Sequence, residues 1–111
     1  LPQRYAEALA PVPAVRVPAV DEDVESVWHL YVIDVENRNR VQRELAARGV
    51  ETLVHYPVPP HQSQAYASDC AWTDLGITER AAQTHLSLPI GPHLATSDQD
   101  LVVEAIRQCM P

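Results

Sequence analysis

Residues 28–57, which read WHLYVIDVENRNRVQRELAARGVETLVHYP, decide the fold of this chain. Trp28 to Val35 carries apolar side chains on both alternating faces, which predicts a strand buried on both sides. A helix capped by Asn37 or Asn39 follows, because apolar residues recur there at helical spacing behind a side-chain oxygen. Val50 to His55 predicts a second strand. Strand, helix of about three turns and strand form a βαβ-like or split unit.

The sequence on either side adds short elements to this unit. A strand at Val15 to Val17 must lie at a sheet edge, because Pro13 and Pro18 cannot donate to a central ladder. Caps, apolar spacing and prolines predict four more elements: a helix tail at residues 4–10, a short helix from Thr78 to about Thr84, a strand at residues 86–89 and a final helix capped by Ser97. The predicted buried stripe of that helix is Leu101, Val102, Ala105, Ile106 and Cys109. We expect an α+β fold, a two-layer sandwich in which helices cover a small sheet of three to four strands.

The composition is that of a globular chain whose charge disfavours nucleic acid. Hydrophobic residues make up 46% and charged residues 21%, and the net charge is −7 because acidic residues outnumber basic ones by 15 to 8. Arg38, Arg40 and Arg43 cluster on the predicted helix among polar residues, which indicates a solvated face. No stretch is typical of a membrane span or a signal peptide, and two cysteines make no disulfide framework, so we expect a cytoplasmic setting.

Seven pieces of the sequence match one known pattern in order and spacing. They are WHLYVI at 28–33, NRVQREL at 39–45, GVETLVHYP at 49–57, PPHQ at 59–62, AY at 65–66, ER at 79–80 and LSLPIGPHL at 86–94. On these pieces the chain resembles, from about Arg4 to its end, the C-terminal small domain of the DegT/StrS-type sugar-nucleotide aminotransferases. These are fold-type-I enzymes that depend on pyridoxal phosphate.

The resemblance implies a division of the chain and a set of partners. Residues 1–12 would be the end of an interdomain linking helix, and residues 13–111 the aminotransferase C-terminal small domain. The partners would be the large cofactor domain of the same enzyme, a nucleotide-linked keto sugar and a glutamate-like amino acid, in a cytoplasmic homodimer that serves amino-sugar biosynthesis. The small domain would close one side of the active-site cleft.

The absence of lysine separates this chain from the covalent chemistry of the cofactor. All eight positive charges are arginine, whereas these enzymes hold pyridoxal phosphate through a lysine amine. The resemblance assigns the catalytic lysine and the cofactor-binding residues to the large domain. We therefore assign no catalytic, cofactor-binding or metal-binding residue here, and expect the chain by itself to bind no pyridoxal phosphate and to lack transaminase activity.

The predicted substrate-binding residues are His55, Tyr56, His61 and His29. The first three leave a predicted strand for a proline-stiffened loop, where ligand-binding groups are commonly placed. An imidazole and a phenol there can hydrogen-bond a sugar hydroxyl, a phosphate or a carboxylate. A purely structural role in the loop or domain interface is the alternative for each, and for His29 a buried, satisfied histidine is the simpler interpretation.

Other readings of the chain stay open. It could be a stand-alone, non-catalytic α+β module that binds a ligand or partner, or the same domain of a family member that dehydrates sugars. A zinc site from His55, His61 and Cys70 fits no known ligand spacing. A Cys70–His61 nucleophilic pair has only nearness in the sequence in its favour.

Overall fold

The computed structural model describes residues 2–68 and 74–111. Within these ranges the α-helices are α1 (Pro2–Leu9), α2 (Arg38–Ala47), α3 (Gly76–Thr84) and α4 (Thr96–Cys109). The strands are β1 (Val15–Arg16), β2 (Tyr31–Val35) and β3 (His85–Leu88), and η1 (Pro60–Gln62) and η2 (Gln64–Tyr66) are single 3₁₀ turns. These elements confirm the expected α+β class with a small antiparallel sheet.

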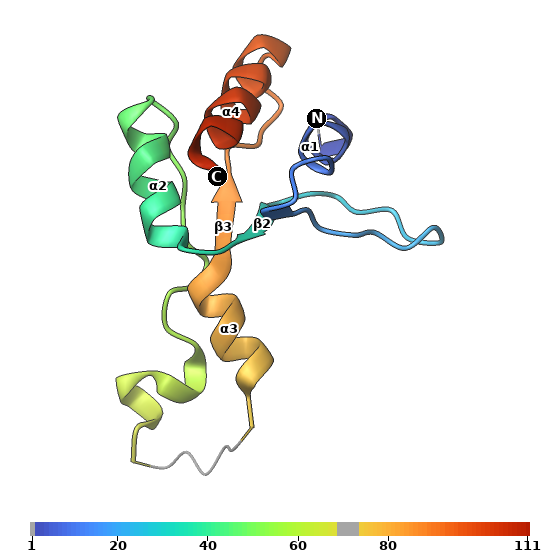
Figure 1. Ribbon diagram of the computed structural model, residues 1–111. Coiled ribbons are helices and arrows are strands. Elements are labelled where there is room, and N and C mark those ends of the chain that lie inside the picture. The colour runs from blue at the N-terminus through green and yellow to red at the C-terminus, as the bar shows by residue number, and fades with distance from the viewer. Residues whose placement is uncertain (1, 69–73) are drawn as a thin grey trace.

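The sheet has the order β1-β2-β3 with both pairs antiparallel, so the two-residue β1 lies at an edge as its flanking prolines require. In the central pair Tyr31 lies opposite Leu88 and Ile33 opposite Leu86. These four side chains share one face and are buried. Figure 1 shows α1, α2 and α4 grouped on this side of the molecule, and all three contribute to the same core cluster.

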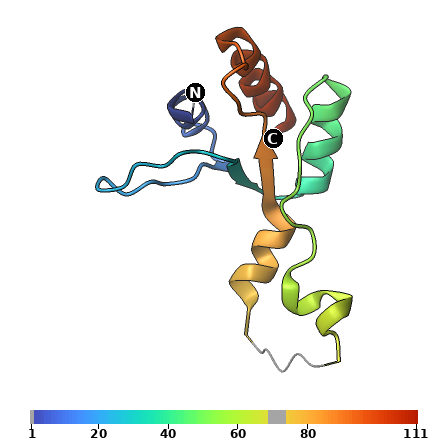
Figure 2. The same cartoon turned by 180° about the vertical axis from the view of Figure 1, so that it is seen from behind.

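Two parts of the chain leave this core in different directions. The connection between β1 and β2 forms a long arm that projects from the body in both views (Figures 1 and 2). α3 continues from the start of β3 away from the helical layer, and the segment with η1 and η2 lies on the same side (Figure 1). None of the helices in the described ranges combines the length and apolar character that crossing a bilayer needs.

The predicted strand from Trp28 to Val35 is shorter and less buried than expected. It begins at Tyr31, and Trp28 has φ 47°, a left-handed conformation that does not belong to extended backbone. Burial alternates along β2, with Val32 and Asp34 half-exposed. Full burial on both sides is therefore wrong for the described chain, in which the helices cover one face of the sheet.

The prediction of a strand from Val50 to His55 is also wrong. The segment makes one isolated antiparallel bridge, in which the backbones of Leu53 and Ser87 exchange two hydrogen bonds. The next bonded pair along β3 would use His85, but its N–H donates to the Ala81 carbonyl and its carbonyl accepts from Arg38. In the other direction lies Pro89, which has no N–H to donate. The ladder cannot extend on either side of the bridge.

Arg38 does not lie on a solvated face as predicted. It is buried, and its guanidinium donates to the carbonyls of Ala82 at 3.0 Å and His85 at 2.9 Å. These carbonyls end α3, so the arginine satisfies acceptors that the helix leaves open. The contact spans 47 positions in the sequence, which is why the helix pattern alone did not indicate it.

Helix starts and one core position differ from the predictions. Asn37 occupies the N-cap position of α2 as predicted, but its side chain makes no capping hydrogen bond, and Gly49 follows the end of the helix at φ 79°. The N-cap positions of α3 and α4 are Leu75 and Ala95, before the expected Thr78 and Ser97. Leu101 of α4 is 66% exposed, and Gln99 and Val103 are buried with the rest of the predicted stripe. The buried face is rotated slightly because α4 packs against both α1 and α2.

Candidate functional site

The candidate site is centred on His55, two residues after the bridge that ties the chain to β3. Its Nδ1 lies 2.9 Å from the Ser87 hydroxyl oxygen. Tyr56 follows through a cis peptide bond, and its ring stands edge-on to the imidazole, with centroids 5.5 Å apart and planes at 89°. Tyr56 is exposed and His55 is half-buried. Both side chains are accessible to a ligand.

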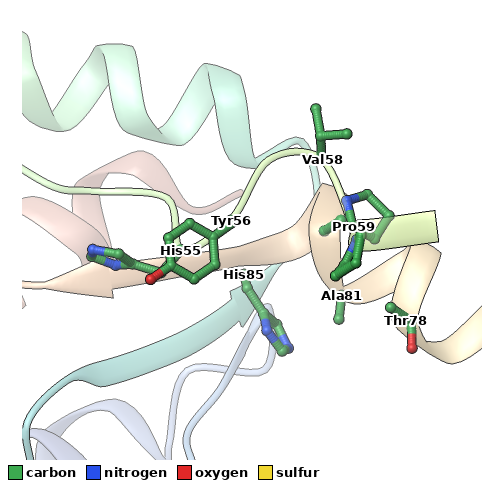
Figure 3. Close-up of a pocket in the computed structure, with 9 residues that line it drawn as sticks. His55, Tyr56, Val58, Pro59, Thr78, Ala81 and His85 are labelled. Atoms are coloured by element: carbon green, nitrogen blue, oxygen red, sulfur yellow. The ribbon is translucent and has the colours of Figure 1, made fainter. Parts of the chain in front are cut away.

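A first cavity, cavity A, measures about 390 Å³ and lies between this segment and α3. Its lining includes His55, Tyr56 and His85 at one end and Thr78, Ala81 and Ala82 of α3 at the other. Figure 3 shows the His55, Tyr56 and His85 side chains along β3, on the side of the picture away from Thr78 and Ala81. The cavity combines an apolar wall with a few hydrogen-bonding groups, the usual chemistry of a small-molecule site.

A second cavity, cavity B, measures about 460 Å³ and also includes His55 in its wall. It brings together His29, His55 and His93 with Glu51 and Ser87. Thr52 lines it as well, and its buried hydroxyl has no hydrogen-bond partner among the described residues. Cavity B therefore joins two of the predicted site residues, and His55 lies at the boundary between the two cavities.

His61 lies outside both cavities. It lines a third one of about 470 Å³, with Tyr66 and Leu75, and its Nε2 lies 3.0 Å from a Glu79 carboxylate oxygen. Pro60 and Thr78 line this cavity as well as cavity A. His61 is thus a neighbour of the His55 site, held by a partner on α3.

Sequence reasoning missed three residues of the site. His85 follows the end of α3 and lines cavity A, and His93 lies in the turn before α4 and lines cavity B. Ser87 had no assigned role. Its signal was the pattern Leu86-Ser87-Leu88, in which two inward leucines leave the serine on the opposite face of the strand.

The described residues test the metal and thiol alternatives only in part. There, no three His, Cys, Asp or Glu residues group as metal ligands would. Cys70, on which the zinc and nucleophile alternatives depended, lies outside the described residues. Cys109 is a free, buried cysteine on α4, as its place on the apolar stripe predicted, and burial raises the pKa of its thiol.

Comparison with known proteins gives one consistent family. The sequence profile of the DegT/DnrJ/EryC1/StrS aminotransferase family matches residues 1–107. The chain is 40% identical, over 97% of its length, to a dTDP-3-amino-3,4,6-trideoxy-alpha-D-glucose transaminase of Streptomyces venezuelae, of which it covers 29%. It is 41% identical, over 96% of its length, to the erythromycin biosynthesis sensory transduction protein EryC1 of Saccharopolyspora erythraea, of which it covers 30%.

Solved structures agree with the sequence matches. The crystal structure of S. venezuelae DesV in complex with a ketimine intermediate superposes with a TM-score of 0.87 at 40% identity, over 96% of this chain and 29% of that one. Bacillus subtilis NtdA with bound cofactor PMP gives a TM-score of 0.87 at 30% identity, over 97% of this chain and 26% of that one. The chain thus spans less than a third of these relatives. It belongs to the DegT/DnrJ/EryC1/StrS aminotransferase family.

Proposed function

We propose that this chain is the C-terminal small domain of a pyridoxal-phosphate-dependent aminotransferase that acts on a nucleotide-linked keto sugar with a glutamate-like amino donor. The observation that carries the proposal is the 40% identity, across nearly the whole chain, to a protein named as a transaminase of a dTDP-linked sugar. Residues 13–111 are the small domain, and residues 1–12 end the helix that links it to the large cofactor domain. The enzyme is a cytoplasmic homodimer.

The residues of this chain do not fit the covalent anchoring of pyridoxal phosphate. That linkage needs a lysine amine, and the chain has none. The cofactor therefore belongs to the large domain, and the small domain contributes binding, orientation and exclusion of water.

His55, Tyr56, His29 and His61 contact the substrates in this proposal. His55 and Tyr56 present hydrogen-bonding groups to cavity A, and His55 and His29 to cavity B. Such groups bind sugar hydroxyls and phosphate oxygens. His61 would reach the substrate from the adjoining cavity, which shares Pro60 and Thr78 with cavity A.

The test uses the full-length protein that contains this chain, supplied with pyridoxal phosphate, glutamate and a panel of dTDP- and UDP-linked keto sugars. We expect formation of an amino sugar together with an equal amount of 2-oxoglutarate. Release of a dehydrated sugar without consumption of glutamate would instead identify a dehydratase. A complete lack of turnover with loaded cofactor would contradict the proposal.

Replacing His55 with alanine in the same protein tests the site. We expect kcat/KM to fall about ten- to a hundred-fold, because a hydrogen bond to a charged group contributes about 1.5–3 kcal/mol. Some stability is lost as well, since the buried Ser87 hydroxyl loses its recorded partner. Unchanged kcat/KM for both donor and acceptor would remove His55 from the site.

A further inference from the structure

We propose that Ser87 is a positioning residue that holds the His55 imidazole between cavities A and B, so that Nε2 is presented to the substrate. The inference rests on the proposed function, in which His55 contacts substrate. It adds a residue to which neither the sequence pattern nor the family resemblance assigned a role.

One residue of β3 holds both the backbone and the side chain of this segment. The Ser87 N–H donates to the Leu53 carbonyl at 2.8 Å, and the Leu53 N–H donates to the Ser87 carbonyl at 3.2 Å. Two residues later the His55 Nδ1 meets the Ser87 hydroxyl at 2.9 Å. The backbone bridge fixes the position of the chain near His55, and the hydrogen bond to the Ser87 hydroxyl fixes the orientation of the imidazole ring.

The hydroxyl is well placed for this role. Ser87 is 5% exposed, so little water competes for its oxygen. Its neighbours Leu86 and Leu88 face the core, and Ser87 therefore faces the other side of the sheet. The Leu53 backbone lies beside β3, at the edge opposite β2. Within the described residues, His55 is the one recorded side-chain partner of this hydroxyl.

A serine hydroxyl can pair with a histidine ring nitrogen in either tautomer. The hydroxyl donates to Nδ1 when that nitrogen carries no proton and accepts from it when it does. An ionised carboxylate, such as that of Glu79 beside His61, can only accept. Ser87 therefore holds the ring in either tautomer and leaves Nε2 available to a ligand.

The hydrogen bond from Ser87 matters because His55 lies at the boundary between the two cavities. The imidazole borders two cavities of about 390 and 460 Å³. An unrestrained ring could turn toward either one, and side-chain rotation of this kind carries an entropic cost when a ligand must stop it. Ser87 removes that cost in advance and keeps the ring in one orientation.

The experiment compares Ser87→Ala, His55→Ala and the double variant in the full-length enzyme, with sugar-acceptor kinetics for each. We expect Ser87→Ala to lower kcat/KM about ten-fold, the effect of one lost hydrogen bond. In the His55→Ala background the same change should lower it by less than about two-fold, because the two residues act as a unit. Ser87→Thr, which keeps the hydroxyl, should recover most of the activity.

Thr84→Ala is the matched control. Thr84 is also buried, and its hydroxyl donates to the Arg80 carbonyl at 3.1 Å, away from His55. It should lower the melting temperature without lowering kcat/KM. The positioning role is overturned if Ser87→Ala, like this control, leaves kcat/KM unchanged. It is also overturned if the effects of Ser87→Ala and His55→Ala on kcat/KM are fully additive, or if His55→Ala does not change kcat/KM. A failure of the proposed function is distinguishable from this outcome, because in that case the wild-type enzyme itself shows no aminotransferase activity.

Discussion

At the residue scale, two buried tyrosines differ in whether the hydroxyl group has a hydrogen-bond partner, and this difference affects the stability of the fold. The rings of Tyr5 and Tyr31 lie 5.2 Å apart in the core. The Tyr5 hydroxyl donates to the Pro89 carbonyl at 2.9 Å, whereas the buried Tyr31 hydroxyl has no hydrogen-bond partner among the described residues. An unpaired buried hydroxyl is costly, and a paired one is not.

The two tyrosine-to-phenylalanine variants should therefore differ in sign. Tyr5→Phe should lower the free energy of unfolding by about 1 kcal/mol, because it removes a hydrogen bond and leaves the Pro89 carbonyl unpaired. Tyr31→Phe should be neutral or stabilising, since it removes a hydroxyl without a recorded partner. Urea unfolding of both variants provides the measurement, and a larger loss for Tyr31→Phe would contradict this account.

The same two phenols predict loss of stability at alkaline pH. Burial raises the pKa of Tyr5 and Tyr31 from 10.0 to about 12, with the Tyr31 charge adding to the effect on Tyr5. Above pH 10 the unfolded chain loses phenolic protons that the folded chain keeps, so stability present below pH 10 falls as pH rises toward 12. Urea midpoints across this window should fall for the wild type and fall less for Tyr5→Phe; equal slopes would contradict this.

At the scale of elements, one arginine joins two helices. Arg38 begins α2, and its guanidinium contacts the carbonyls that end α3 and start β3. Burial lowers the pKa of this guanidinium from its ordinary value, yet arginine stays charged in proteins. The planar fork can meet both carbonyls at once, which a lysine ammonium cannot do with the same geometry.

Arg38→Met should therefore lower the free energy of unfolding by more than the loss of an exposed arginine on the same helix would. We expect a fall of about 1.5–3 kcal/mol in the free energy of unfolding, because two partly buried carbonyls lose a charged donor. Arg38→Lys should recover only part of it. Arg43→Ala, an exposed arginine on the same helix, is the control and should stay within about 0.5 kcal/mol. Equal effects at both positions would show that the fork contributes nothing.

At the scale of the whole molecule, apolar side chains reach the surface on the parts that project from the core. Val27 on the β1–β2 arm is 95% exposed, Ile77 at the start of α3 is 89% exposed, and Tyr56 and Val58 are exposed beside cavity A. Exposed apolar surface promotes association. The net charge of −7 opposes it at low salt.

Sedimentation of the 111-residue chain should therefore show reversible self-association that strengthens with protein concentration and with salt, because salt screens the repulsion between copies. A Val27→Asp, Ile77→Glu double variant should shift the distribution toward the monomer. A single monomeric species at every concentration and salt would count against an apolar contact surface.

Local sequence determined the features that depend on backbone conformation and periodicity. The prolines after α1, the helical spacing of Val41 and Leu45, and the left-handed Gly49 placed α1 and α2 correctly within a few residues. Short runs rich in apolar residues located the cores of β2 and β3. Together with the ordered motifs, these features were sufficient for the fold class and the family, because each is set by neighbours along the chain.

The tertiary structure alone decided which partners meet across long separations. The Val50–His55 segment looks like a strand, but its neighbour's hydrogen bonds are already taken by α3 and by Arg38. His55 meets Ser87 across 32 positions, and His85 and His93 join the cavities around it. Periodicity says which face of an element is apolar. The polar group that a given side chain contacts depends on how the elements pack against one another, and no local sequence pattern contains that information.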